Sequence, residues 1–484
     1  MRHSNLINLK VEKKTDTART GKYSIRGVEF QFPSYIPELK GEEDWKVFMN
    51  HPDLLPKNSP IILPSGHWAS LVTSIPLPTL DYDISVAKAI RDHHLIFFEP
   101  PEIYSYKLPQ ILLRHSFHGS DSTGRLFRKY VSESRYGNAL GLLPPFERKF
   151  VEAAWDYILA LEKRKKNNPI TLPKDVPTSE YRRNFEKLWL TVDKEYISKI
   201  QGMMYEAPKQ GSASFIPPVP VLKSSSNSEL VSQVVRMNRA AAFLAAQSFE
   251  SSTGEQFTKP NVALPWLSLY LDSSCFEIGA ENSGKVGLDT IYRIVQNSFD
   301  TKSHVGISLV INGIERLKSV PTKKNRLISL IESLDEFAIS RGIPILLPRS
   351  GYFGFELIDY GVEFFSSMLS GAFKYSSGGR DLDPSDKYGK TVVYRVGELS
   401  LAELNTYLTR NGELPTVSTL PSKPTVEQMN DATKFRVTFS KPRRIATHIR
   451  EMSEISEAIS KGTIKPATQY LTGMISEEGK NYLA

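Results

Sequence analysis

The sequence contains a single cysteine, Cys275, among 484 residues. One cysteine cannot form a disulfide within the chain, and it cannot supply the set of thiolates in a cysteine-based zinc site. The sequence also lacks an apolar run approaching the roughly 20 residues that a membrane helix needs. Its first residues, MRHSNLINLKVEKKTD, contain no apolar stretch of signal-peptide length. We therefore expect a cytoplasmic protein with no membrane anchor and no disulfide.

The sequence has fewer acidic than basic residues: 53 aspartates and glutamates against 61 lysines and arginines, which gives a formal net charge of +8. This surplus is typical of a solvated surface rich in lysine or of a protein that binds a polyanion such as nucleic acid. Hydrophobic residues make up 40% of the chain and charged residues 24%, which indicates an ordinary globular protein with a sizeable core.

Short apolar runs rich in Val, Ile, Phe and Leu recur along the chain and predict eight β-strands. Helical patterns follow most of them, including 228–249 and 322–341, the latter with Gly342 as its cap. This alternation predicts parallel strands and a closed (β/α)₈ TIM-type barrel of the α/β class, with a doubly wound open sheet as the alternative. The predicted strands are 27–37, 60–66, 94–101, 214–222, 264–272, 305–313, 343–351 and 362–369.

We predict that the barrel spans residues 1–413, with one insertion inside it and two further segments after it. Residues 144–206 are long, charged and helical in character, and we interpret them as a helical insertion. Residues 414–427 are rich in Pro, Ser and Thr and predict a linker. Residues 428–484 then predict a helical C-terminal extension.

Motifs at both ends of the chain and near the eighth predicted strand resemble those of a known family. Residues 18–21 (ARTG) precede 32–37 (FPSYIP), and residues 361–366 (GVEFFS) open the last strand. Near the C-terminus, 443–445 (RRI) is followed by a Met, Ile, Ala, Ile pattern over 452–459. In this order the motifs resemble those of the tRNA-guanine transglycosylase superfamily, whose members exchange a guanine in nucleic acid for a deazaguanine base on a (β/α)₈ barrel.

The departures from that family concern its chemistry. The resemblance implies a nucleophilic aspartate at the position of Ser366, and a second carboxylate whose best counterpart is Glu99. It also implies a zinc site of three cysteines and one histidine, but the cysteines are missing and Arg443 stands at the histidine position. We therefore expect no zinc and no other cofactor.

Catalytic groups of such barrels follow the C-terminal ends of the strands, which makes Glu99, Asp272 and Glu363 the catalytic candidates. Each residue also has a purely structural interpretation. Asp272 suits a helix N-cap, Glu99 an exposed loop, and Glu363 a salt bridge. Arg349 ends the seventh predicted strand and suits either a phosphate contact or a buried pair with a carboxylate.

Basic residues predict a nucleic-acid-binding surface. Those in 125–129 and 374–380 follow predicted strands, and those in 441–444 begin the C-terminal helix. His115 and His118 have i, i+3 spacing, but no further ligand is evident, so we predict no metal site. The nucleic-acid-binding candidates are Arg125, Arg128, Lys129, Arg349, Lys374, Arg380, Arg443 and Arg444.

Two functions from different classes are consistent with these residues. The first is a divergent base-exchange transglycosylase that acts on tRNA or DNA, with Glu99 and Asp272 as its carboxylates. The second is a catalytically degenerate barrel that serves as a nucleic-acid-binding or protein-interaction subunit, within a homo- or hetero-oligomer. The serine at 366 and the missing zinc ligands favour the second, whereas the retained carboxylates favour the first. Whether Glu99 and Asp272 face each other across one pocket discriminates between them.

Overall fold

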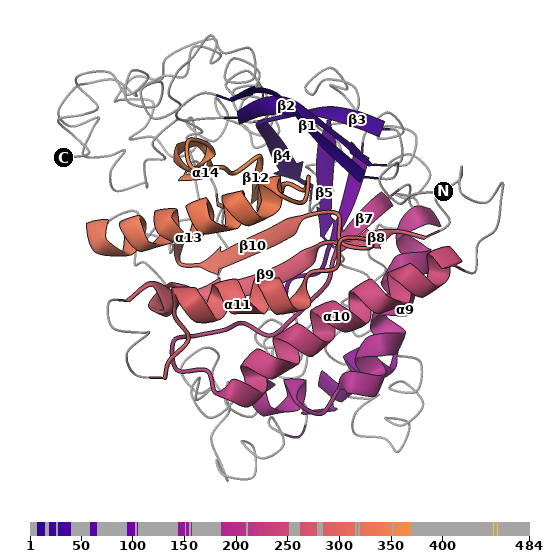
Figure 1. Cartoon of the computed structure of the whole chain (residues 1–484). Helices are drawn as coiled ribbons and strands as arrows, with labels where there is room; N and C mark the ends of the chain where they lie inside the picture. The colour runs from indigo at the N-terminus through magenta and orange to yellow at the C-terminus, as the bar shows by residue number, and fades with distance from the viewer. Residues whose placement is uncertain are drawn as a thin grey trace, which may run out of the picture.

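The computed structural model describes residues 7–14, 19–25, 28–39, 59–64, 94–101, 104, 144–150, 152–153, 156, 185–209, 212–250, 262–277, 284–314, 317, 320–350, 353–368, 449 and 453. Figure 1 shows their arrangement as a curved sheet with helices on its outer side. The predicted linker 414–427 lies outside these residues, as does the predicted C-terminal extension apart from two positions.

A parallel sheet of nine strands, counted over the described residues, curves into a nearly closed barrel (Figure 1). Its order is β8-β7-β6-β5-β4-β12-β11-β10-β9. Trp266 alone separates β8, which pairs with β7, from β9, which pairs with β10. Residues 264–272 therefore form both edge strands of the sheet, and this continuous segment brings the two edges of the sheet together. The strands are β4 (Ser34–Glu38), β5 (Pro60–Pro64), β6 (His94–Phe98), β7 (Ser212–Ile216), β8 (Leu264–Pro265), β9 (Leu267–Asp272), β10 (Ile307–Asn312), β11 (Ile345–Leu347) and β12 (Phe364–Met368).

The eight predicted apolar runs all contribute strands to this sheet. Parallel strands covered on both faces need continuous apolar sequence, and five of the six residues of β9 and of β10 are buried. The last two runs pair in parallel as β11 and β12, as expected. The first run divides at Pro33, which has no amide hydrogen to donate to a ladder, so its first half belongs to another sheet.

That other sheet is antiparallel and was not predicted. It contains β1 (Ile7–Lys14), β2 (Arg19–Ile25) and β3 (Val28–Phe32). The Tyr23 hydroxyl donates to the carbonyl oxygen of Val305, just before β10, and the Phe32 ring packs 6.4 Å from that of Phe364 at the start of β12. The small sheet therefore covers the end of the barrel at which its strands begin.

The helices follow their sequence patterns. They are α9 (Asp193–Lys209), α10 (Ser228–Glu250), α11 (Leu288–Ser298), α13 (Pro321–Ile339), α14 (Phe353–Ile358) and the 3₁₀ helix η5 (Ser273–Phe276). The predicted helices 228–249 and 322–341 are confirmed as α10 and α13, and Gly342 follows α13 with φ of 65°. Among the described helices, none has both the length and the apolar character to cross a membrane.

The described parts of 144–206 are largely helical, and the part 157–184 lies outside the described residues. The last of these helices, α9, packs against β7 and α10. This end of the segment therefore belongs to the layer of helices around the sheet.

Candidate functional site

The C-terminal ends of the strands bring polar side chains to one end of the barrel. In a parallel barrel this end carries the loops that hold ligands and catalytic groups. Because successive side chains of a strand alternate between the two faces, only some of these groups face the interior. The polar residues at this end are Glu38, Glu99, Asp272, Asn312, Arg349 and Ser366.

Glu38 and Arg349 form a buried ion pair between the end of β4 and the turn after β11. Arg349 Nε donates to both carboxylate oxygens, at 3.1 and 2.8 Å, and Nη2 donates to Oε1 at 2.5 Å. The side chains are 0% and 3% exposed. The guanidinium also lies 4.9 Å from the centre of the Phe98 ring. The sequence allowed Arg349 a phosphate contact, and the structure instead shows the buried pair with a carboxylate.

Ser366, at the position of the family's nucleophilic aspartate, lies in β12 and is fully buried. Its hydroxyl accepts a hydrogen bond of 2.9 Å from the backbone amide of Arg349. Arg349 has φ of 56°, an uncommon value for a residue with a side chain. The serine hydroxyl therefore holds a strained turn in place, and that turn carries the arginine to Glu38.

Glu99 was expected either as a catalytic carboxylate or as an exposed loop residue, and it is 1% exposed. Its Oε1 lies 2.8 Å from Lys199 Nζ on α9, and the same ammonium bonds Glu147 Oε1 at 2.5 Å. Burial alone would lower the pKa of Lys199, but the two carboxylates outweigh it and raise that pKa. The exposed-loop interpretation is wrong, because Glu99 belongs to a buried cluster of three charges.

The Glu99 side chain extends into the layer of helices rather than into the barrel. Phe98, one residue earlier, packs on the other face, with its ring stacked 6.4 Å from that of Tyr270 on β9. A cluster of aromatic side chains in mutual contact includes Tyr196, and burial together with the charge of Glu99 raises the pKa of the Tyr196 hydroxyl. These aromatic residues are Tyr104, Phe146, Phe150, Trp189 and Tyr196.

Asp272 ends β9 and uses both carboxylate oxygens. Oδ1 accepts from the backbone amide of Ser274 at 3.0 Å, which makes Asp272 the N-cap of η5, as its structural interpretation predicted. Oδ2 accepts from Asn312 Nδ2 at 2.6 Å. The partners of Asp272 therefore lie in η5 and β10, whereas the partner of Glu99 lies in α9. The structure gives the two carboxylates different partners and does not assemble them as a facing pair.

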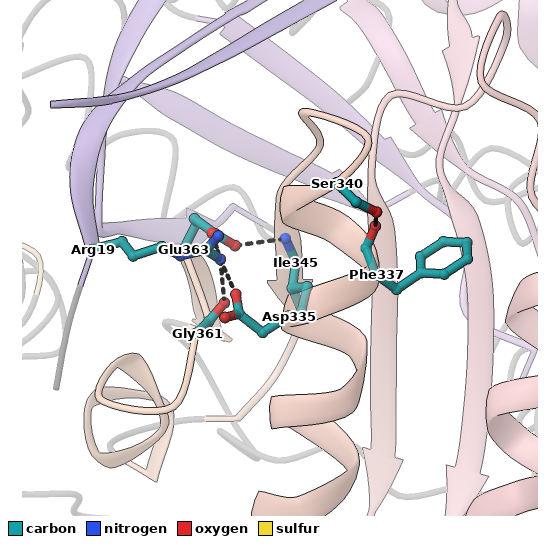
Figure 2. Close-up of polar contacts among 7 residues, drawn as sticks. All are labelled: Arg19, Asp335, Phe337, Ser340, Ile345, Gly361 and Glu363. Carbon is teal, nitrogen blue, oxygen red and sulfur yellow. Dashed lines mark hydrogen bonds and ion pairs between the residues drawn. The ribbon is translucent and has the colours of Figure 1, made fainter. Parts of the chain in front are cut away.

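Glu363 lies at the opposite end of the barrel, just before β12. The Arg19 guanidinium contacts both Glu363 and Asp335 of α13, and it donates to Gly361 O at 3.2 Å (Figure 2). Glu363 Oε2 accepts from the amide of Ile345 at 2.8 Å. The expectation that Glu363 joins the other candidates is wrong, because it precedes its strand. Its salt-bridge interpretation is confirmed.

Burial raises the pKa of Glu363 to about 7 even though Arg19 lowers it. The folded chain then binds a proton more tightly than the unfolded chain, so the stability contributed by this group is lost as pH rises from about 4.5 to 7. We expect Glu363→Gln to gain stability relative to wild type over this range, by at most about 1.4 kcal/mol per pH unit. Urea unfolding at several pH values measures this difference.

The matched control for that prediction is Glu29→Gln, which changes a glutamate whose side chain is 61% exposed. Because this side chain is exposed and its ion pair with Lys22 is 3.7 Å long, the replacement should change stability little. If wild type instead gained stability relative to Glu363→Gln as pH rises, the effect of Arg19 on the pKa of Glu363 would exceed the effect of burial.

Several predicted residues lie outside the described part of the chain. Within that part, no group of three His, Cys, Asp or Glu side chains is arranged to hold a metal ion. Cys275 is buried, and its thiol has a pKa raised by burial to about 12. The residues outside the described part are Arg125, Arg128, Lys129, Lys374, Arg380, Arg443, Arg444, His115 and His118.

The sequence did not point to Glu38, to Lys199, or to a basic groove between α10 and α11, which is lined by Arg236, Arg239, Lys285 and Arg293. Glu38 had a signal, because it directly follows the first predicted run, 27–37, and lies on the same face of the strand as Ile36. Lys199 had none, since its acidic partners lie 52 and 100 residues away in the chain.

No protein-family model matches the chain, and no curated protein matches it. Among the described residues, the two candidate functional features are the basic groove and the polar groups at the C-terminal end of the barrel.

Proposed function

We propose that this chain is a divergent tRNA-guanine transglycosylase-like protein, built on a (β/α)₈ TIM-type barrel, that acts on tRNA or DNA and exchanges a guanine for a 7-deazaguanine base. The observation that carries the proposal is the group of polar side chains at the C-terminal ends of the strands, since barrel enzymes hold their chemistry there. The ion pair of Arg19 with Glu363 adds support, because it joins two of the motifs that resemble the family, 18–21 and 361–366.

Base exchange of this kind needs two carboxyl groups. One carboxylate attacks C1′ of the target nucleoside while the C1′–N9 bond breaks, and the departing guanine takes a proton on N9 from the second carboxyl group. The incoming base then returns an N9 proton to that second group, and its N9 displaces the first carboxylate from C1′. The net result is one base replaced by another, with both carboxyl groups restored.

Glu38 and Asp272 are our candidates for these two roles, because each ends a barrel strand close to the interior. Glu38 is fully buried against Arg349, so its attack on a nucleoside requires this ion pair to open first. One oxygen of Asp272 accepts a hydrogen bond from the side-chain amide of Asn312, and this amide can reorient toward a substrate. Glu99 is the third carboxylate at this end, and Lys199 holds it behind the barrel wall.

The second candidate function is a barrel that binds nucleic acid without exchanging a base. The ion pairs favour it, because Glu38 and Glu99 are both satisfied by a buried cation in the described structure. The serine at position 366 favours it as well, since a hydroxyl without an adjacent base is a poor nucleophile.

Incorporation of radiolabelled guanine into tRNA and into DNA distinguishes the two functions. Degenerate exchange of guanine for guanine breaks the same bond, so an exchanging protein leaves label in one polymer. We expect Asp272→Asn to lower incorporation at least about a hundredfold, the usual effect of removing a general acid or base. The matched control, Glu277→Gln, changes a carboxylate that is 54% exposed and should exchange normally. Nucleic-acid binding without incorporation would support the second function, and absence of both would refute both.

A further inference from the structure

A groove of about 570 Å³ lies between α10 and α11 on the outer side of the barrel. The two helices are neighbours in Figure 1 and in their contacts. The floor of the groove is apolar and comes from Val231, Val235 and Ile294. This volume is within the usual range for ligand sites.

The walls of the groove carry four cations and, among the described residues, no carboxylate. The cations are Arg236 and Arg239 on α10, Lys285 in the segment before α11, and Arg293 within α11. Asp193 lies 3.9 Å from Arg236, and both side chains are more than half exposed, so this ion pair is weak. The groove therefore has a net positive charge that the described structure does not neutralise.

Hydrogen bonds orient the arginines without removing their charge. Arg239 Nε donates to the carbonyl oxygen of Asn297 at 2.6 Å, and Arg293 Nε donates to that of Asp289 at 3.3 Å. Both acceptors are neutral backbone groups. Each guanidinium is thus held at the groove while its charge stays available to an anion.

Helical spacing explains why these side chains converge. Ser228, Ser232 and Arg236 follow one another at intervals of four residues along α10, and Arg239 continues the row. The facing row on α11 contains Thr290, Arg293 and Asn297. From Ser228 to Arg239 the row extends about 16 Å, long enough for several consecutive phosphates of a strand rather than one compact anion.

The groove begins at the same end of the barrel as the candidate active site. The amide of Val286, beside the groove, donates to Ser224 O at 3.0 Å, and the Ser224 amide donates to Ser274 Oγ at 3.2 Å. Ser274 is the residue that Asp272 caps. A strand that crosses the C-terminal end of the barrel can therefore continue directly into the groove.

We infer that the α10–α11 groove binds the phosphodiester backbone of the nucleic acid on which the protein acts. This inference rests on the proposed function and names a contact surface for it. Hydroxyl, amide and guanidinium donors in two rows suit phosphate oxygens, and contacts to phosphates fix the position of a polymer without reading its sequence. The groove thus positions the polymer, and selection of the base belongs to the end of the barrel.

The test is the salt dependence of binding of a fluorescein-labelled tRNA transcript and a DNA of equal length, measured by anisotropy. We compare wild type with the double variant Arg236→Ala, Arg293→Ala. The matched control is Lys22→Ala, Lys302→Ala, which removes the same charge at the opposite end of the barrel. The groove variant should bind at least tenfold more weakly at low salt, and its slope of log affinity against log salt should fall by about 0.7 to 0.9 for each phosphate that it no longer neutralises. The control should bind like wild type.

The outcomes separate this inference from the proposed function. If wild type binds and both double variants bind equally well, the groove assignment is wrong and the proposed function is untouched. If polyglutamate of equal charge displaces the labelled strand as well as unlabelled strand does, the groove is not specific for phosphodiesters and the inference fails. If wild type binds neither polymer at low salt, the inference fails together with the proposed function. Guanine incorporation, measured on the same preparations, reports on the barrel site alone.

Discussion

Arg349→Met should destabilise the folded protein by about 3–5 kcal/mol, because it leaves the Glu38 carboxylate buried without its cation. Glu38 is fully buried and accepts three bonds from this one guanidinium. Methionine keeps much of the packing against Phe98 but supplies no donor. Urea unfolding followed by circular dichroism measures the loss.

The double variant Glu38→Leu, Arg349→Met is the control for this prediction. It removes both charges, so it should be clearly more stable than Arg349→Met alone, and the two changes should couple strongly in a double-mutant cycle. A single variant within about 1 kcal/mol of wild type would show that the pair is solvated and that Arg349 is accessible to ligands.

Lys199→Met should have a comparable effect, because it leaves two buried carboxylates, Glu99 and Glu147, without a shared cation. We expect a loss of about 3–5 kcal/mol at pH 7. The loss should be smaller at pH 5, since buried carboxylates without a cation bind protons more tightly in the folded chain than in the unfolded chain. Unfolding of the variant and of wild type at both pH values measures the difference.

Adding Glu147→Gln to Lys199→Met tests the same cluster from its acidic side. With one carboxylate left, the double variant should recover part of the stability lost at pH 7. The matched lysine control is Lys323→Met, whose Glu277 partner is 54% exposed and which should change stability little. A loss in Lys199→Met that did not depend on pH would point to poorer packing rather than to charge.

The strands and the main helices could be predicted because their sequences carry a strong period. Parallel strands buried on both faces must be apolar throughout, as β9 and β10 are. The row of apolar residues in 322–341 likewise predicted α13, with Gly342 as its stop. The antiparallel sheet was missed because the predicted strands were limited to apolar runs, whereas β1, INLKVEKK, alternates apolar and polar residues as a strand with one solvated face does.

The candidate site was predicted less well, because it depends on the direction in which each side chain points and on partners far away in the chain. Glu99 and Phe98 are neighbours in the chain, yet they face opposite sides of the barrel wall, and a shift of one residue would exchange them. The partner of Glu38 lies 311 residues away, so no local pattern announces it. The groove combines rows from two helices, and each row alone looks like an ordinary charged surface.

Mass spectrometry of the nucleosides of bulk tRNA and bulk DNA, from cells with and without the gene, tests the central claim most directly. The proposed exchange predicts a 7-deazaguanine nucleoside in one of the two polymers that is present only with the gene. Cells that carry Asp272→Asn should lose it, and cells that carry Glu277→Gln should keep it. Identical nucleoside profiles in both polymers, with and without the gene, would contradict base exchange.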